Sequence, residues 1–575
     1  MQYFKQKTAE ALYDAISSVT GESGLTVDNI KELLEYPPDD TMGDVAFPCF
    51  RLSKTMRMAP PKIAAELSEK LDGFEHGTVT TAGGYLNFRI SDEYLEKHVL
   101  SVIEEKGEKY GSDGRGEGKN VVLDYSSPNI CKPFHIGHLG TTVIGHSLKL
   151  LHEYAGYNCT GINYLGDWGT QFGKQIIAYR RWADKNIIEN GTNDEKVDEL
   201  VRIYVKYHEE AEKDPALDDE ARAEFHKMEE GDEENLALRQ KFVDISLAEY
   251  KKTYKQMNIE FDSYKGESFY TDKMPAQVEK LRELGLLKID NGASIVDLEE
   301  YGMPPCLILK KDGSTLYPTR DIAAAVYRKN TYNFDKAIYV TSSAQSLHFS
   351  QWFKVVEMMG YDWFGGLVHV PYGTVSVGGA KLATRTGNVV LLKDLFRLAS
   401  DKVLEVMNEK NPDLENREDV AEAVGIGAII FNYLYNSRIK DINFTLDQAL
   451  SFEGSTGPYA QYTYARTCSI LSKAKENGID VNGGKLTHAS EAELLKTLSR
   501  FPEKVADALE SYEPSVITRY VIEVCTAFNH FYRDCPIVSA ETDEQKQFRV
   551  RLTKATNIIL GTALHLICMK TPEKI

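Results

Sequence analysis

The alternation of apolar and polar positions divides the chain into a mixed part and a helical part. Short apolar runs such as VVLDY (121–125) and KAIYV (336–340) are each followed by a helical pattern. Strands that alternate with helices are typical of a parallel sheet that binds ligands beyond the carboxyl ends of its strands. After about residue 395 the strand pattern fades, and helical patterns cover 396–410, 417–439, 457–476, 491–511, 513–534 and 543–568. We therefore expect an α/β unit followed by an all-α bundle.

The segment before this sheet predicts a small α+β domain. Its first helix pattern carries Phe4, Leu12 and Ile16 on one face, and GGYLNFRI (83–90) alternates as a strand does. The glycine-rich stretch 107–120 precedes a strand. A phosphate-binding loop follows a strand and opens a helix, so we interpret this stretch as a linker.

Insertions are expected within the sheet. Residues 185–260 read as long charged helices, and Asp312-Gly313 predicts the turn of a hairpin that precedes a helix. The predicted domains are 1–110, 111–370 with insertions at about 172–245 and 270–312, a loop and stem-contact region at 371–395, and a helical domain at 396–575.

Charge and cysteine content narrow the class of protein. The net charge of −19 argues against a broadly basic surface, but much of the acid lies in 209–234, so a local basic groove stays open. The eight cysteines are scattered without a C-x-x-C pair, which indicates free thiols in a reducing compartment. No apolar run approaches the ~20 residues that span a bilayer. We expect a cytoplasmic protein that does not enter a membrane.

The stretch SSPNICKPFHIGH (126–138) carries the clearest chemistry. Cys131, His135 and His138 could ligate zinc only on a regular helix, which Pro133 interrupts, and no fourth ligand is near. We therefore expect no metal site. A phosphate site fits better, because the histidines open a helix after a strand and helix N-termini favour anions. A helix cap with two surface histidines remains an alternative on these residues alone.

This stretch is the first of six sequence blocks that, in their order along the chain, resemble a known family. They are SSPNICKPFHIGHL (126–139), GDWGTQFG (166–173), LYPTRDIAAA (316–325), SSAQSLHFSQ (342–351), GGAKLATRTGNVV (378–390) and FEGSTGPYAQYTYAR (452–466). Together they resemble class I aminoacyl-tRNA synthetases, and arginyl-tRNA synthetases in particular. The resemblance implies a Rossmann-like parallel sheet with helical insertions, an N-terminal α+β domain that touches the tRNA elbow, and a C-terminal helical bundle that binds the anticodon.

The resemblance also implies a reaction and its partners. Arginine would attack ATP, taken with Mg²⁺ as its substrate complex, and the arginyl group would pass to the 3′ end of tRNA(Arg). We expect a monomer without a structural metal. A different class I synthetase and a non-catalytic tRNA-binding relative remain alternatives.

Roles for the phosphate-binding residues follow from the same resemblance. His135, Gly137 and His138 would contact ATP. The family's second signature, Lys-Met-Ser-Lys-Ser, is degenerate here; Lys381 and Arg385 retain its charges, and Lys132 would compensate. A further departure is Gly140, where the family usually has arginine.

The amino acid and tRNA sites are assigned in the same way. A guanidinium prefers a planar carboxylate partner. By resemblance, Asp321 and Tyr317 hold it, although Asp321 could instead cap a helix. The expected arginine-binding residues are Asp124, Ser127, Asn129, Tyr317, Asp321 and Gln345. The expected tRNA-binding residues are Tyr459, Tyr462 and Arg466, with a helix-core role open for two of the nearby tyrosines.

Overall fold

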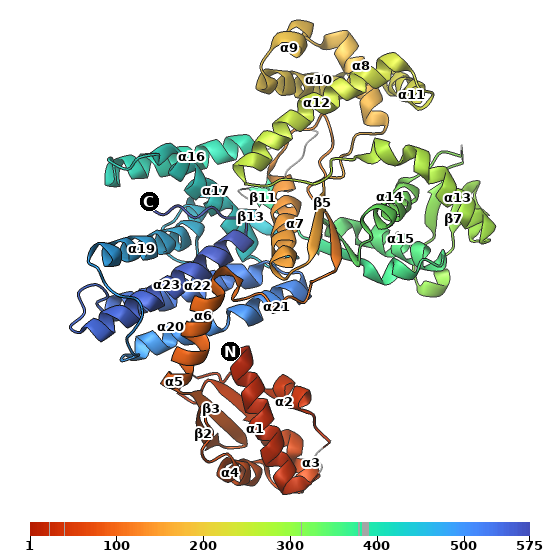
Figure 1. Cartoon of the computed structure of the whole chain (residues 1–575). Coiled ribbons are helices and arrows are strands. Elements are labelled where there is room, and N and C mark those ends of the chain that lie inside the picture. The colour runs from red at the N-terminus through yellow and green to blue at the C-terminus, as the bar shows by residue number, and fades with distance from the viewer. Residues whose placement is uncertain (22–23, 40, 312, 378–379, 382–389) are drawn as a thin grey trace.

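The computed structural model describes residues 1–575 except 22–23, 40, 312, 378–379 and 382–389. Its N-terminal unit packs helices against an antiparallel sheet of order β1-β3-β2, at the bottom of Figure 1. The strands are β1 (Val45–Pro48), β2 (Gly77–Ala82) and β3 (Tyr85–Ile90). The helices are α1 (Gln2–Thr20), α2 (Val27–Leu33), α3 (Ser53–Met56), α4 (Pro60–Lys70), α5 (Asp92–Leu95) and α6 (Ser101–Lys106). The predicted apolar face of α1 is confirmed, because Phe4, Leu12 and Ile16 are buried.

The central sheet is parallel throughout and has the order β10-β9-β4-β5. Its strands are β4 (Asn120–Asp124), β5 (Asn158–Ile162), β9 (Lys336–Ser342) and β10 (Leu367–Tyr372). The predicted β-α-β unit is confirmed, with α7 (Ile136–Tyr154) between β4 and β5. The sequence analysis did not predict β10, whose short LVHVPY run contains a histidine and a proline.

Two insertions lie between β5 and β9 in the sequence. The first is helical and lies at the top of Figure 1; it contains α8 (Thr170–Trp182), α9 (Lys185–Asn190), α10 (Asn193–Lys213), α11 (Ala216–Glu229) and α12 (Glu233–Gln256). The second contains α13 (Met274–Glu283), β6 (Leu287–Asp290), β7 (Ala293–Val296) and β8 (Cys306–Leu309). The helices α14 (Tyr317–Tyr332) and α15 (Ser346–Met358) follow β8 and β9.

The hairpin predicted around residue 313 is largely wrong. β8 pairs with β7 and completes a β6-β7-β8 meander, and a single bridge between Leu309 and Thr315 spans the predicted turn. Asp312 lies outside the described residues.

The C-terminal part is helical, as predicted, with two corrections. Its helices are α16 (Leu392–Lys410), α17 (Arg417–Tyr435), α18 (Leu446–Ala449), α19 (Gly457–Glu476), α20 (Ala489–Ser499), α21 (Phe501–Ser511), α22 (Ser515–Asp534) and α23 (Asp543–Leu566). The single helix expected over 491–511 is two helices, because Pro502 lacks an N–H and lies in the first turn of α21.

A strand also occurs where none was expected. β13 (Ile442–Phe444) pairs in parallel with β11 (Val375–Val377), which pairs with β12 (Ala380–Lys381) on its other side. The apolar core is continuous from the central sheet into the C-terminal helices. The predicted domain boundaries stay a prediction.

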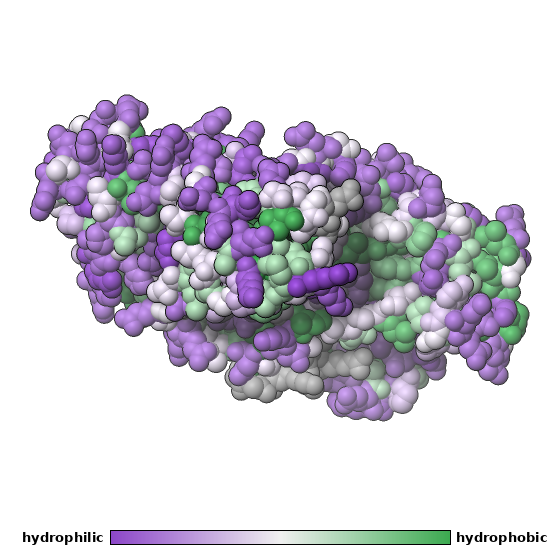
Figure 2. Space-filling model, turned by 90° about the horizontal axis from the view of Figure 1, so that it is seen from below, coloured by the Kyte–Doolittle hydropathy of each residue, from purple (hydrophilic) through white to green (hydrophobic). Residues whose placement is uncertain are grey.

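Exposed apolar side chains gather at the edge of the second insertion. Figure 2 shows apolar residues at the end of the molecule that holds α13 and β7, where Leu284, Ile289 and Leu307 are exposed. Among the described helices, none combines the length and the apolar character that crossing a membrane requires.

Candidate active site

The loop after β4 is held in an unusual backbone conformation. Ser126, Ser127 and Cys131 all have positive φ, at 69°, 47° and 63°. Non-glycine residues rarely adopt this region unless their surroundings fix it. Here the first insertion does so from α12: the hydroxyls of Ser126 and Tyr254 are 2.7 Å apart, and the Cys131 N–H donates to Ser246 Oγ at 3.2 Å. The helical insertion therefore shapes the loop that leads to α7.

Two histidines cap the N-terminus of α7. The Gly137 N–H donates to His135 Nδ1 at 3.0 Å, and the His135 N–H donates to His138 Nδ1 at 3.2 Å. A backbone N–H can only donate, so each Nδ1 is unprotonated and each neutral ring carries its proton on Nε2. The helix-cap alternative and the phosphate hypothesis are therefore compatible, because capping uses Nδ1 and leaves an Nε2–H donor.

The electrostatics of these rings keep them neutral. Burial, and next the positive charge of Lys132, lower the pKa of His135 to about 4. Burial also lowers the pKa of His138, with further lowering from His135 and Lys132. Both imidazoles are therefore neutral hydrogen-bond donors at pH 7.

Gly137 makes room for a side chain of the cap. A Cβ at this position would lie 2.6 Å from His135 Cε1. The glycine therefore leaves room for the His135 ring to fold back over the helix. Within the described ranges, no group of three His, Cys, Asp or Glu side chains could hold a metal ion.

One cavity of about 630 Å³ lies beyond the carboxyl ends of the parallel strands. This is where open α/β sheets bind their ligands. It gathers predicted residues from separate segments of the chain. Its lining includes Asp124, Ser127, Asn129, His138, Tyr317, Asp321 and Gln345.

The β4 side of the cavity is built around Asp124. Its Oδ2 receives a hydrogen bond from Arg328 Nη1 at 2.7 Å, and its Oδ1 receives one from Ser127 Oγ at 2.9 Å. Asn129 lies against the GDWG loop, where a Cβ at Gly166 would be 2.2 Å from Asn129 Oδ1. Gly166 therefore makes room for this amide.

The opposite side of the cavity comes from α14 and the start of α15. Leu316 is the N-cap of α14, so the alternative of Asp321 as the cap is wrong. Asp321 Oδ2 instead accepts a hydrogen bond from His348 Nε2 at 2.6 Å. Tyr317 is 67% exposed, and Gln345 immediately precedes α15.

Sequence reasoning missed three groups in this cavity. Arg328 and His348 hold the two predicted carboxylates, and Glu267 pairs with Arg320 at 3.0 Å. Burial raises the pKa of Glu267 to about 7. A usable signal existed for Arg328, which follows Asp321 by seven residues and thus lies on the same face of a helix.

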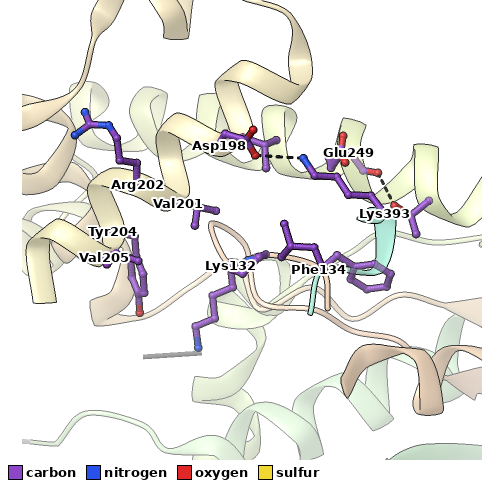
Figure 3. A pocket seen from close by; sticks show the side chains of 13 residues that line it. Lys132, Phe134, Asp198, Val201, Arg202, Tyr204, Val205, Glu249 and Lys393 are labelled. Atoms are coloured by element: carbon purple, nitrogen blue, oxygen red, sulfur yellow. Dashed lines mark hydrogen bonds and ion pairs between the residues drawn. The ribbon is translucent and has the colours of Figure 1, made fainter. Parts of the chain in front are cut away.

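The other predicted phosphate-binding cations are Lys132, Lys381 and Arg385, of which the structure describes the side chain of Lys132 alone. Lys132 lines a separate cavity of about 360 Å³ between its own loop, α10 and the start of α16 (Figure 3). An ion pair between Lys393 Nζ and Asp198 Oδ1, 3.2 Å apart, links two walls of this cavity. The backbone of Lys381 lies in β12, and Arg385 lies outside the described residues.

The predicted tRNA-binding residues lie on α19. Arg466 stacks between Tyr462 and Tyr532, with its Cζ 4.9 Å and 5.1 Å from their ring centres. Both tyrosines are exposed, at 44% and 45%. Tyr459 is half-buried, and its hydroxyl accepts a hydrogen bond from Asn529 Nδ2 at 2.8 Å. The sequence analysis missed Tyr532, which comes from α22.

Comparison with family models assigns the class. The model "tRNA synthetases class I (R), catalytic domain" matches residues 98–446, more than half of the chain. The "DALR anticodon binding domain" model matches 460–575, and the "Arginyl tRNA synthetase N terminal domain" model matches 5–90. With its parallel sheet and histidine-capped helix, the protein is a class I aminoacyl-tRNA synthetase.

Relatives at high identity narrow the class to one family. The chain is 50% identical over 578 residues to an arginine–tRNA ligase of Alkaliphilus metalliredigens, covering all of both chains. It is 51% identical over 552 residues to one of Clostridium botulinum, covering 96% of this chain and 97% of the relative. The chain belongs to the arginyl-tRNA synthetase family.

Solved structures share the fold. The arginyl-tRNA synthetase of Plasmodium falciparum aligns with a TM-score of 0.82 at 23% identity, over 100% of this chain and 99% of that one. That of Thermus thermophilus aligns with a TM-score of 0.80 at 24% identity, over 98% and 100%.

Proposed function

We propose that the cavity beyond β4 and β9 is where this arginine–tRNA ligase binds L-arginine and forms its adenylate. One observation carries the proposal: predicted residues from three of the six sequence blocks, together with Asp124, line the same cavity. The cavity offers carboxylates on two sides, which suits a ligand with a guanidinium at one end and an ammonium at the other.

Each end of arginine has a proposed partner. The guanidinium pairs with Asp321, with Tyr317 and Gln345 at the mouth of the cavity. The α-ammonium group lies by Asp124 and Asn129, with Ser127 beside them. The α-carboxylate then points toward His138, which lines the same cavity.

The proposed first step places ATP, with its Mg²⁺, at the start of α7. A carboxylate oxygen of arginine attacks the α-phosphorus, and the bond to the pyrophosphate oxygen breaks, which gives arginyl-adenylate and pyrophosphate. The Nε2–H groups of His135 and His138 donate to phosphate oxygens, and the N-terminus of α7 favours the negative charge. Lys132, Lys381 and Arg385 supply further positive charge.

In the second step, the 2′-hydroxyl at the 3′ end of tRNA(Arg) attacks the arginyl carbonyl carbon, and AMP leaves. The exposed sandwich of Tyr462, Arg466 and Tyr532 supports an anticodon contact, because aromatic and guanidinium planes stack on unpaired bases. The Tyr459 hydroxyl holds the side chain of Asn529 beside this sandwich through a hydrogen bond. Residues 1–110 contact the tRNA elbow. The enzyme acts as a cytoplasmic monomer.

The test is charging of unfractionated tRNA with each of the twenty labelled amino acids. We expect charging with arginine alone, and loss of arginine charging in Asp321→Asn at substrate concentrations that saturate the wild type. Charging with another amino acid, or full activity of Asp321→Asn, would contradict the proposed site.

A further inference from the structure

Arg328 is an arginine of the protein itself inside the wall of the cavity. It lies on α14, two helical turns after Asp321, and is 1% exposed. Arginine is rarely buried to this degree unless it is paired. The cavity lining nevertheless includes it. Its guanidinium therefore acts on the site from behind the residues that would touch the substrate.

This guanidinium makes one ion pair among the described residues. Its Nη1 donates to Asp124 Oδ2 at 2.7 Å. Nε and Nη2 have no hydrogen-bond partner within bonding geometry in the part of the chain that the structure describes. The rings of Tyr164, Tyr270 and Tyr339 surround the charge, with Arg328 Cζ 5.1, 5.9 and 5.6 Å from their centres. The guanidinium is thus fixed by stacking and by a single ion pair.

Asp124 needs this partner to remain a carboxylate. Burial raises the pKa of Asp124, Arg328 opposes that rise, and the negative charge of Asp321 adds to it. The other titratable side chains that line the cavity are His138, Tyr164, Glu267, Tyr317, Tyr339, His348 and Tyr372, and Tyr270 packs against Arg328. Arg320 pairs with Glu267, so Arg328 is the cation whose side chain contacts Asp124 directly among the described residues. Without it, protonation of Asp124 would be strongly favoured.

We propose that Arg328 is a positioning residue that keeps Asp124 ionised and aimed at the α-ammonium group of bound arginine. It thereby sets the preference for an α-amino acid over a ligand with the guanidinium alone. The inference rests on the proposed assignment of Asp124 to the ammonium end. It concerns a residue that does not touch the substrate, and it goes beyond the roles assigned above.

The experiment compares Arg328→Gln and Arg328→Lys with a matched control, Arg549→Gln. Arg549 on α23 is also buried and pairs with the buried Glu491 on α20 at 2.7 Å, in the helical part of the chain. Breaking either pair removes a buried cation and leaves a carboxylate behind. Thermal melts of all three variants show which of them fold. Arg328→Lys retains the charge and keeps the test open if Arg328→Gln does not fold.

Three ligands separate a positioning role from general damage to the cavity. They are L-arginine, agmatine, which lacks the carboxylate, and 5-guanidinopentanoate, which lacks the ammonium. Inhibition of arginine charging gives the affinities of the two analogues, and the KM gives that of arginine. In Arg328→Gln we expect arginine and agmatine to weaken about tenfold or more, and 5-guanidinopentanoate less than about threefold. Arg328→Lys should restore part of the difference, and Arg549→Gln should leave all three unchanged.

The pH dependence gives a second readout. In Arg328→Gln, arginine affinity should recover as the pH is raised, because Asp124, whose pKa burial raises, then loses its proton. Equal weakening of all three ligands, or tighter arginine binding at every pH, would overturn the proposal. Asp124→Asn tests the assignment of Asp124 to the ammonium group separately. If this variant still prefers arginine over 5-guanidinopentanoate as the wild type does, that assignment and this inference fail. The ligase function stands as long as the wild-type enzyme charges arginine.

Discussion

A Cβ added at Gly140 would lie 2.1 Å from the phenolic oxygen of Tyr433. Gly140 lies in the second turn of α7, and the buried Tyr433 comes from α17 in the C-terminal helices. The arginine that the family usually has at position 140 could not fit beside this tyrosine. The departure thus has a physical account: the phenol fills the space that the glycine leaves, and it joins α7 to the C-terminal helices.

This contact predicts a steric cost for Gly140→Ala. Overpacking a dense core costs about 1–3 kcal/mol, so the melting temperature should fall, and turnover should fall because α7 carries both histidines. Adding Tyr433→Phe removes the nearest atom and should recover part of both losses. Gly365→Ala is the control, since a Cβ there meets nothing within 4 Å. A stable, fully active Gly140→Ala would contradict the account.

The two nitrogens of His135 predict separable effects. His135→Asn keeps an oxygen that can accept from the Gly137 N–H, so it should retain the helix cap and the melting temperature. It places no donor at the position of Nε2, so turnover should fall about 10²–10³-fold, as for loss of one donor to a transition-state oxyanion. His135→Ala should lose both, with a further stability cost of about 1 kcal/mol.

The complementary variant is His138→Gln, whose amide nitrogen can reach the position of Nε2. We expect it to retain more turnover than His138→Asn, with arginine KM little changed in both. Steady-state kinetics and thermal melts distinguish these outcomes. Equal losses in the Gln and Asn variants would contradict the assignment of Nε2 as the phosphate donor.

Asp321→Asn should weaken arginine far more than ATP. It removes the charge that we propose faces the guanidinium but keeps the shape, and loss of one partner in a buried charge pair costs about 2–5 kcal/mol. Arginine KM should therefore rise by tens- to thousands-fold. His348→Ala removes the 2.6 Å hydrogen bond to Asp321 and leaves the charge, so its effect should be smaller, at about 1 kcal/mol. A larger rise in the KM of ATP than of arginine would count against the assignment.

The sequence predicted the site residues that follow strands better than those that support them. The family resemblance identified Asp124, and the strand, loop and helix N-terminus around Asp124 and His138 have clear patterns that place both at one sheet edge. Arg328 was harder to find: its spacing of seven residues from Asp321 places it on the same helix face, but in VYRKN it reads as a surface cation until α14 is packed against β4. β13 was missed because three residues are too few to show alternation, and its partner β11 is 67 residues away.

The last prediction concerns pH and rests on Glu267. Burial raises the pKa of this carboxyl to about 7, from an ordinary value near ~4.3. The folded protein therefore binds this proton more tightly than the unfolded chain does. The resulting stabilisation is complete below the unfolded pKa and is lost as pH rises through about 7. Across the same range Glu267 gains a negative charge inside the cavity proposed to bind the guanidinium and ammonium groups of arginine.

Stability and arginine affinity should thus change in opposite directions between pH 6 and pH 8. For one proton at a pKa of about 7, arginine affinity should rise about three- to tenfold with pH while the Glu267 contribution to stability decreases. Glu267→Gln should remove both dependences and still accept a hydrogen bond from Arg320. The control is Glu199→Gln on α10, which breaks the ion pair between the buried Glu199 and Arg202. The hydrogen bond from Arg202 is the main cause that lowers the pKa of Glu199. The arginine profile of Glu199→Gln should match the wild type. An unchanged pH dependence of arginine KM in Glu267→Gln would show that another group titrates.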